Sequence, residues 1–182
     1  MSDRTLLVIY ATVHGQAELI ARRIAEAASE SRVATLVRGV RGASGTDLQR
    51  CDSAIIVASV HYGRHARSIT RFVKANRGRL SAMHSAFVSV SGSAVDPATR
   101  PEAEKYVDDF LRLTGWTPTV RQLFGGAVKF TKYNFLLRFM TKRAFAAKGI
   151  VLDTRRDYDH TDWDAVTRFA KAFVAAQGAK VA

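Results

Sequence analysis

Cysteine and proline are scarce in this sequence. Cys51 is the only cysteine, so no intrachain disulfide can form. No Gly-, Ser- or Pro-rich stretch marks a linker, and the chain contains only three prolines. A chain of 182 residues that is 47% hydrophobic can bury a full core. We therefore expect one compact domain spanning residues 1–182, without internal repeats.

Long apolar runs are also absent. No stretch approaches the roughly 20 apolar residues that a membrane-spanning helix needs, so any membrane contact should be peripheral. The first residues run directly into a strand pattern without the apolar core of a signal peptide, which favours a cytoplasmic protein. We expect no metal site, because none of the possible ligands falls at zinc-like spacing: Cys51, His14, His61, His65, His84 and His160.

Acidic residues are few relative to basic ones. Lys and Arg number 28 against 16 Asp and Glu, a formal net charge of +12 that favours an anionic partner: nucleic acid, an acidic membrane surface, or a carboxylate or phosphate ligand. The usual nucleic-acid-binding modules are missing, so we expect no nucleic-acid partner. Residues 129–156 hold eight basic residues and one acidic residue, so this stretch supplies +7 of the +12.

Five short strand candidates, the first of them the apolar run Leu6 to Tyr10, alternate with amphipathic patterns along the chain. Runs without polar alternation are typical of strands buried on both faces, and the amphipathic stretches between them predict helices. The alternation indicates a doubly wound α/β sheet, in which ligands bind at the carboxyl ends of the strands. The expected strands are Leu6 to Tyr10, Val33 to Val37, Ala54 to Ala58, Ser85 to Val90 and Val120 to Val128, with a loop at Arg38 to Thr46.

Loops rich in small and polar residues follow the first, third and fourth expected strands. The first loop suits a phosphate group, because N–H groups at a helix N-terminus are unpaired, Gly15 permits close approach and Thr12 can donate a hydrogen bond. The alternative is an ordinary tight turn, which needs small residues for steric reasons. The three loops supply the candidate cofactor-binding residues: Thr12, Val13, His14, Gly15, Gln16, Ala17, Ser59, Val60, His61, Tyr62, Gly63, Ser91 and Gly92.

The basic stretch 129–156 separates the fifth expected strand from the last helix. If residues 133–148 are helical, one apolar face can pack on the domain, while Phe135 and Phe139 lie nearly opposite, flanked by Arg138 and Lys142. The second face suits a membrane interface or a flat hydrophobic ligand. In the alternative interpretation, both faces belong to the core.

The last helix has a clear start signal. Thr161 and Asp164 form a Thr-x-x-Asp variant of the capping box, and Gly178 is the expected end. Apolar residues at helical spacing predict its buried face: Trp163, Val166, Phe169, Ala170, Phe173 and Val174.

The order of these elements resembles the flavodoxin fold, a five-stranded parallel sheet of order 2-1-3-4-5 whose phosphate loop reads Ser/Thr-x-Thr-Gly-x-Thr. Thr12 and Gly15 match that pattern, whereas His14 and Ala17 depart from it and supply no hydroxyl. A more specific resemblance, over nearly the whole chain, is to the flavodoxin-like, quinone-linked protoporphyrinogen IX dehydrogenases. It is carried by Ala58 to Gly63 in the second loop, Ser85 to Val90, Arg138 to Met140 and Thr161 to Trp163.

This resemblance implies FMN-dependent oxidation of protoporphyrinogen IX to protoporphyrin IX in haem biosynthesis, with electrons passed to a membrane quinone. It also implies a protein held at the inner face of the cell membrane through residues 129–156. Tyr62 is expected to stack on the flavin or, alternatively, to pack in the core. His61, Arg64 and His65 are expected to form a cationic loop that stabilises reduced flavin. Arg64 and Arg138 are the candidates for the substrate propionates.

Other functions share parts of this pattern. A flavodoxin-type electron-transfer protein or an FMN-dependent quinone reductase is the alternative, although carrier flavodoxins are typically acidic near the flavin and lack a basic insertion. A receiver domain would need an acidic pair after the first strand, where Tyr10 and Ala11 stand, and an aspartate after the third, where Ser59 and Val60 stand. The sequence leaves open the quinone type, the oligomeric state and the residue that accepts the substrate's protons.

Overall fold

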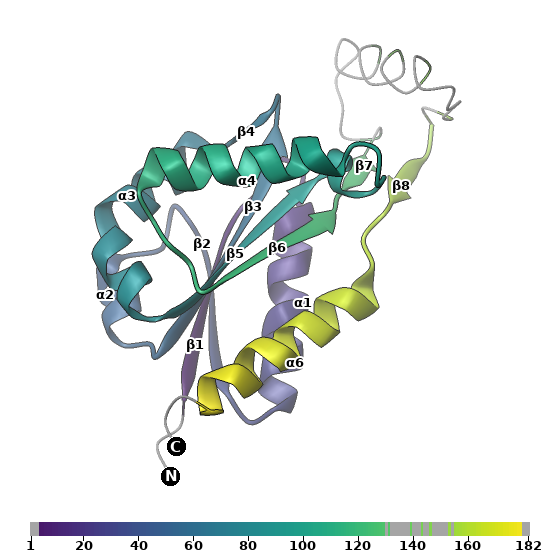
Figure 1. Cartoon of the computed structure of the whole chain (residues 1–182). Coiled ribbons are helices and arrows are strands. Elements are labelled where there is room, and N and C mark those ends of the chain that lie inside the picture. Colours follow the sequence, from purple (N-terminus) through teal and green to yellow (C-terminus); the bar gives the residue numbers. More distant parts are fainter. Residues whose placement is uncertain are drawn as a thin grey trace.

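A parallel sheet forms the centre of the molecule (Figure 1). The computed structural model describes residues 4–129, 131, 139, 143, 146, 153 and 155–179. The sheet order is β2-β1-β3-β5-β6, which confirms the predicted 2-1-3-4-5 arrangement of the five parallel strands. The strands are β1 (Thr5–Ala11), β2 (Ala34–Gly39), β3 (Ser53–His61), β5 (His84–Ser91) and β6 (Val120–Gly125); β4 (Arg64–His65) pairs antiparallel with the end of β3.

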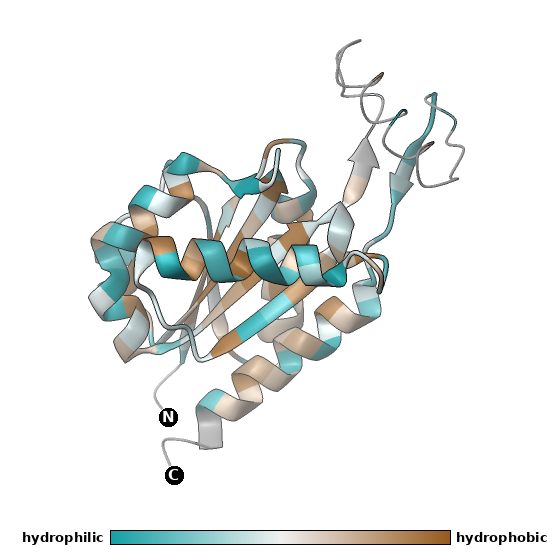
Figure 2. Ribbon diagram, turned by 45° about the horizontal axis from the view of Figure 1, so that its top comes forward, coloured by the Kyte–Doolittle hydropathy of each residue, from teal (hydrophilic) through white to brown (hydrophobic). Residues whose placement is uncertain are grey.

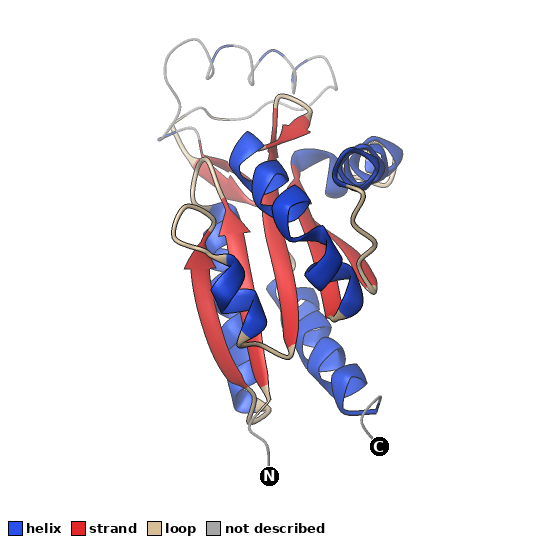
Figure 3. Ribbon diagram, turned by 90° about the vertical axis from the view of Figure 1, so that its left-hand side faces the viewer, coloured by secondary structure: helices blue, strands red, loops and turns tan. Residues whose placement is uncertain are grey.

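Helices cover both faces of the sheet (Figure 3). α1 (Gln16–Glu30) and α6 (Trp163–Ala179) pack on one face, while α2 (Gly45–Gln49), α3 (Arg67–Ala82) and α4 (Arg100–Thr114) pack on the other. A 3₁₀ turn, η1 (Gly92–Ala94), follows β5. The short helix α2 replaces part of the expected loop at Arg38 to Thr46, because Ser44 and Asp47 form a reciprocal capping box that starts it.

Burial on both faces explains why the central strands β1, β3 and β5 read as largely apolar runs. In β1, Leu6 and Val8 belong to the core under α1 and α6, whereas Leu7 and Ile9 belong to the core under α3 and α4. All four side chains are fully buried. Figure 2 shows the hydrophobic residues concentrated in the sheet and hydrophilic residues on the outer surfaces of the helices. These central strands therefore have no solvated face that would impose polar alternation, whereas the edge strands β2 and β6 carry the exposed Arg38 and Arg121.

The expected fifth strand, Val120 to Val128, is wrong as a single strand. β6 ends at Gly125, and β7 (Ala127–Lys129) instead pairs antiparallel with β8 (Asp157–Asp159). The chain leaves the sheet at Gly125, where it passes close to the backbone of His160. A Cβ atom added at Gly125 would lie only 2.5 Å from the carbonyl oxygen of His160. Gly126 then donates its N–H to the carbonyl of Ser91 and accepts from the N–H of His160. These contacts give the chain a new pairing partner after Gly126.

The start of α6 also differs from the expected capping box. Asp162, not Thr161, caps the helix, because its Oδ1 accepts from the N–H of Ala165 at 2.8 Å. Thr161 is buried and donates its hydroxyl to the carbonyl of Gly125 at 2.9 Å. The helix continues one residue past Gly178. The predicted buried face is confirmed, with Trp163 and Phe169 half-buried against the core.

Most of the expected helix at 133–148, including Arg138, lies outside the described residues, so its two apolar faces stay a prediction. From that stretch the structure describes Phe139, whose side chain is 55% exposed. Lys129 pairs with Asp157 in the β7–β8 ladder, so the two ends of the basic stretch lie side by side. Within the described residues, no helix has both the length and the apolar character needed to cross a bilayer.

His65 packs between core aromatic rings. Its ring centroid lies 5.1 Å from that of Phe87 and 5.0 Å from that of Phe110, both in edge-on contact. His65 Nε2 and Ser89 Oγ share a hydrogen bond of 3.0 Å. Burial lowers the pKa of His65 from 6.5 to about 4, so the ring is neutral at pH 7. The expectation that His65 contributes a cation is therefore wrong.

Replacing Gly125 with alanine should lower the free energy of unfolding by about 1–3 kcal/mol, because the added methyl has no room beside the His160 carbonyl. Gly78 is the matched control: it lies inside α3 with nothing within 4 Å of its missing Cβ, and Gly78→Ala should stabilise by up to about 1 kcal/mol. Urea denaturation of both variants measures the difference. Equal effects would contradict the close backbone crossing.

The neutral His65 should make stability depend on pH. The unfolded chain binds a proton near pH 6.5 and the folded chain only near pH 4, so stability should fall as the pH is lowered through this window. The loss amounts to about 3 kcal/mol at most. In His65→Gln this contribution disappears, and the decline between pH 6.5 and 4 should be shallower. Replacing the exposed His160 with glutamine controls for the loss of a histidine, and an unchanged decline in His65→Gln would exclude the effect.

Candidate flavin site

The carboxyl ends of β1, β3 and β5 lie in register at one end of the sheet. Ala11 pairs with Ala58, and Ser59 pairs with Val90, so the three loops that follow these strands are neighbours. Ser59 Oγ donates to the carbonyl of Ala11 at 3.3 Å and thereby ties the second loop to the first. The strand order reverses between β1 and β3, which is where doubly wound sheets bind their ligands.

The first loop has the geometry of an anion cradle. Gly15 is the N-cap residue of α1 and adopts a left-handed conformation with φ 90°, which glycine reaches without strain. Thr12 Oγ1 accepts from the N–H of Gly15 at 2.8 Å, so its own hydroxyl hydrogen can point to a ligand. The first helical hydrogen bond runs from Leu19 to Gly15, leaving the preceding N–H groups of α1 outside the helical ladder. A phosphate fits this loop.

Two residues of the first loop can contribute only backbone groups to that cradle. Ala17 is fully buried and belongs to the core between the sheet and α1. The Gln16 side chain is also buried and donates from Nε2 to Asp159 Oδ1 at 3.0 Å and to Thr161 Oγ1 at 2.8 Å. These partners precede α6. Gln16 therefore connects the first loop to residues 159–161, the segment between the basic stretch and α6.

The second loop, expected as a polar and aromatic loop after the third strand, is a tight hairpin. β3 continues to His61, which pairs with Arg64 of β4. The two turn residues, Tyr62 and Gly63, have φ of 49° and 73°. Two successive left-handed residues are typical of type I′ hairpin turns, whose twist matches that of the strands. The turn holds Tyr62 outward, 71% exposed, which excludes the alternative that Tyr62 packs in the core.

Aromatic rings join the first two loops. The rings of His61 and Tyr62 meet edge-on at 4.2 Å between centroids, and His61 meets His14 in the same way at 5.4 Å. Val13, at the outside of the first loop, is 50% exposed. This surface, formed by His14, His61 and Tyr62, offers a flat ring the apolar and edge-on contacts that aromatic ligands use. Arg64 is exposed beside it and supplies a permanent positive charge.

The third loop contributes a buried hydroxyl that lacks a partner. The Ser91 side chain is buried, and within the described part of the chain its Oγ finds no hydrogen-bond partner. Such a group is costly unless a ligand or water completes it. A Cβ atom added at Gly92 would have no described atom within 4 Å, so the space beside this backbone is open. The orphaned hydroxyl and the open backbone fit the polar edge of a bound flavin.

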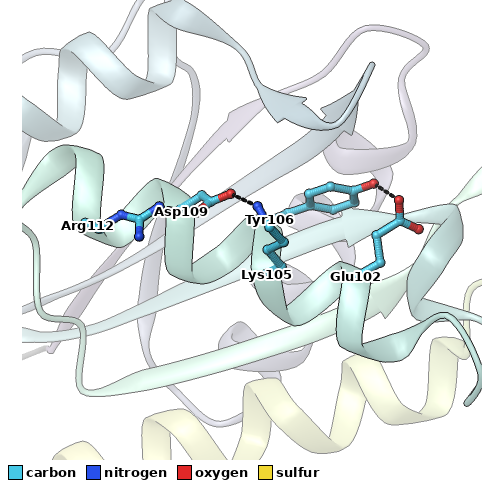
Figure 4. A network of polar contacts seen from close by, with 5 residues as sticks. All are labelled: Glu102, Lys105, Tyr106, Asp109 and Arg112. Atoms are coloured by element: carbon cyan, nitrogen blue, oxygen red, sulfur yellow. Dashed lines mark hydrogen bonds and ion pairs between the residues drawn. The ribbon is translucent and has the colours of Figure 1, made fainter.

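The third loop is also braced from α4, as Figure 4 shows for part of this network. Ser93 Oγ donates to Glu102 Oε2 at 2.8 Å, and the Tyr106 hydroxyl donates to Glu102 Oε1 at 2.6 Å. Burial, and then its hydrogen bond to Glu102, raises the pKa of Tyr106, which keeps the phenol protonated as a donor. Glu102 and Tyr106 thus act as positioning residues that sequence analysis did not identify.

Asp159 is the other residue that the sequence did not reveal. Its Oδ1 accepts from Gln16 Nε2 and from the N–H of Thr161, while its Oδ2 accepts from Trp163 Nε1 at 3.2 Å. The local sequence Asp159-His160-Thr161 resembles a cap and gives no sign that Asp159 bonds to Gln16, 143 residues earlier in the chain. Arg138, the second substrate candidate, lies outside the described residues, so the structure brings only Arg64 to the loops.

Comparisons with known proteins agree with this geometry. The family model for the flavodoxin domain matches residues 7–150. Solved flavodoxins share the fold: one associated with a non-canonical PDU bacterial microcompartment superposes with a TM-score of 0.60 at 15% identity, covering 96% of this chain and 99% of that chain. Oxidised flavodoxin 1 from Bacillus cereus gives a TM-score of 0.57 at 15% identity, covering 94% of this chain and 97% of that chain.

Two curated relatives are closer in sequence. Protoporphyrinogen IX dehydrogenase [quinone] of Escherichia coli (strain K12) is 32% identical over 166 residues, which cover 91% of this chain and 92% of the relative. The protein of the same name from Leishmania major is 31% identical over 172 residues, covering 93% of this chain and 74% of the relative. The chain therefore has a flavodoxin domain with a flavin-type site, and it belongs to the family of the protoporphyrinogen IX dehydrogenases [quinone].

Proposed function

We propose that the protein oxidises protoporphyrinogen IX to protoporphyrin IX in haem biosynthesis, with FMN as its cofactor and a membrane quinone as electron acceptor. The observation that carries the proposal is the convergence of three flavin-type loops in a chain that resembles dehydrogenases of this name over 91% of its length. A bound flavin supplies a two-electron acceptor, and three such oxidations account for the six electrons and six protons that separate substrate from product.

The residues present fit FMN. The Thr12 hydroxyl and the first N–H groups of α1 would hold the phosphate, and the Ser91 hydroxyl and Gly92 backbone would meet polar atoms of the ring. Tyr62 would stack against the ring face, since its turn holds the side chain outward. With His65 neutral, Arg64 is the residue of the second loop that stabilises added negative charge at every working pH.

We also propose that residues 129–156 make peripheral contact with the inner face of the cell membrane. Two features support this. The stretch carries +7, and each basic residue near an anionic surface adds about 1 kcal/mol of attraction. Its two ends emerge beside the third loop, because Gly126 bonds to Ser91 and His160 bonds to Gly126. The strands β7 and β8, from which this segment leaves and to which it returns, lie at the same end of the sheet as the three loops (Figure 1).

Removing the Thr12 hydroxyl should weaken FMN binding. Thr12→Val deprives the phosphate of a donor and the Gly15 N–H of its acceptor, so affinity should fall about 10- to 100-fold, the range for a hydrogen bond to a charged group. Thr12→Ser keeps the hydroxyl and is the matched control, with affinity within a few-fold of the wild type. Quenching of flavin fluorescence on titration measures both. Equal affinity of the two variants would place the phosphate elsewhere.

Porphyrin fluorescence tests the activity directly. Purified protein with FMN and a water-soluble quinone should raise porphyrin fluorescence from protoporphyrinogen IX above the rate of autoxidation. Replacing residues 132–155 with a short Gly/Ser loop, which retains β7 and β8, should leave FMN affinity unchanged and abolish turnover with quinone-containing anionic vesicles, because the membrane-facing charge is gone.

Two results would contradict these proposals in different ways. A wild-type rate no higher than autoxidation rejects the porphyrinogen assignment and favours an electron-transfer flavodoxin or a quinone reductase. A shortened protein that still sediments with anionic vesicles and turns over normally rejects the membrane role of 129–156 while leaving the reaction intact.

A further inference from the structure

A concave surface lies beside the three loops, between α3, β4 and α4. It is a groove of about 700 Å³ that begins at Gly63, in the turn of the second loop, and continues along the facing surfaces of the two helices. Five of its side chains are cationic: Arg64, Arg67, Arg71, Lys74 and Lys105. Asp109 is the one carboxylate among the described residues that line it. We name this surface, defined by these six residues, the basic groove.

Most of this positive charge has no counter-charge in the described part of the chain. Asp109 pairs with Lys105 at 2.7 Å and with Arg112 outside the groove (Figure 4). No described carboxylate lies within 4.0 Å of the cationic groups of Arg67, Arg71 or Lys74, nor of Arg64. Among the described residues, four cations of the groove therefore have no carboxylate partner and are available to a ligand.

The arrangement of these cations is unfavourable for α3 itself. Arg67 and Arg71 are four residues apart, and Lys74 follows three residues later, so like charges repel along one face of the helix. Arg67 is the first residue of α3, and the first turn contains no acidic residue, so the positive charge also opposes the helix dipole. A bound anion would relieve both effects, whereas an empty groove leaves them uncompensated.

The groove is not uniformly polar. Phe110 forms part of its floor and is buried, and Leu113 on the next turn of α4 is 58% exposed. The half-buried Tyr106 and the neutral ring of His65 complete this apolar side. A ligand that satisfies both parts has a hydrophobic body and at least one anionic group. A volume of about 700 Å³ lies within the range of small-molecule sites.

We propose that the basic groove binds the carboxylates of the tetrapyrrole substrate, so that the macrocycle extends over the Tyr62–Gly63 turn toward the flavin loops. This inference rests on the proposed function, which supplies a ligand with two propionates on a large apolar ring. Arginine forks match carboxylates bidentately, and both Arg67 and Arg71 are available. The groove starts within the second loop, so carboxylates held on α3 leave the ring beside the cofactor.

The test compares two double variants of the FMN-loaded protein. Arg71→Gln with Lys74→Gln removes two cations from the groove, and Arg41→Gln with Arg50→Gln removes two exposed cations elsewhere. The Kd for protoporphyrin IX, measured by its fluorescence in a neutral detergent, should rise at least about tenfold in the groove variant. It should stay within about twofold of the wild type in the control. FMN affinity should be the same in all three proteins, which verifies folding.

A ligand without charge provides the second arm. The dimethyl ester of protoporphyrin IX keeps the ring and lacks carboxylates, so the groove variant should bind it as the wild type does. If the groove variant binds protoporphyrin IX itself with wild-type affinity, the proposal is overturned. Loss of sedimentation with anionic vesicles in that variant, at unchanged porphyrin affinity, would overturn it in favour of a lipid-binding groove.

Turnover separates this proposal from the function on which it rests. Oxidation of protoporphyrinogen IX by the wild type, together with a groove variant of unchanged Kd, rejects the groove and retains the reaction. Absence of oxidation by the wild type rejects the reaction, whatever the Kd values are.

Discussion

The constraint on which this structure depends is the burial of β1, β3 and β5 on both faces. Each strand must place successive apolar side chains into two separate cores, so a shift of one strand by a single residue would exchange the contents of both. The register is therefore fixed, and with it the level at which each strand ends. This register brings Thr12, Ser59 and Ser91 together, because each lies at or near the carboxyl end of one of these three neighbouring strands.

Much of the fold could be predicted because it is encoded locally. The apolar run Leu6 to Ile9 indicates a buried strand by itself, and Pro101 in the first turn of α4 marks a helix start. What could not be predicted depends on distant partners. Thr161 has the sequence of a cap, but its hydroxyl accepts from Gln16 Nε2 and donates to the Gly125 carbonyl, and Asp162 caps α6 instead. Val120 to Val128 reads as a single strand candidate in the sequence, while its pairing partner changes from β5 to β8 within it.

In the candidate site, too, local sequence predicted some features, and others depend on distant partners. Residue types predicted the first loop, but they could not tell that Gln16 and Ala17 point into the protein, because the side-chain direction follows from how α1 meets the sheet. Tyr62 stands out in sequence as an aromatic residue near glycine. Its exposure results from left-handed backbone at a residue other than glycine, a conformation that sequence patterns do not favour. The neutrality of His65 depends on Phe87 and Phe110, which come from different elements.

The β7–β8 ladder has a consequence for how such a protein can diversify. By pairing Lys129 with Asp157, it closes the basic stretch at its base, and the hydrogen bonds of Gly126 and His160 anchor that base to the third loop. Closing a longer loop costs little extra entropy, about 0.6 kcal/mol for each doubling. Segments of different length or composition can therefore be exchanged at this point without disturbing the first loop, so this part of the surface can vary between lineages independently of the three loops at the end of the sheet.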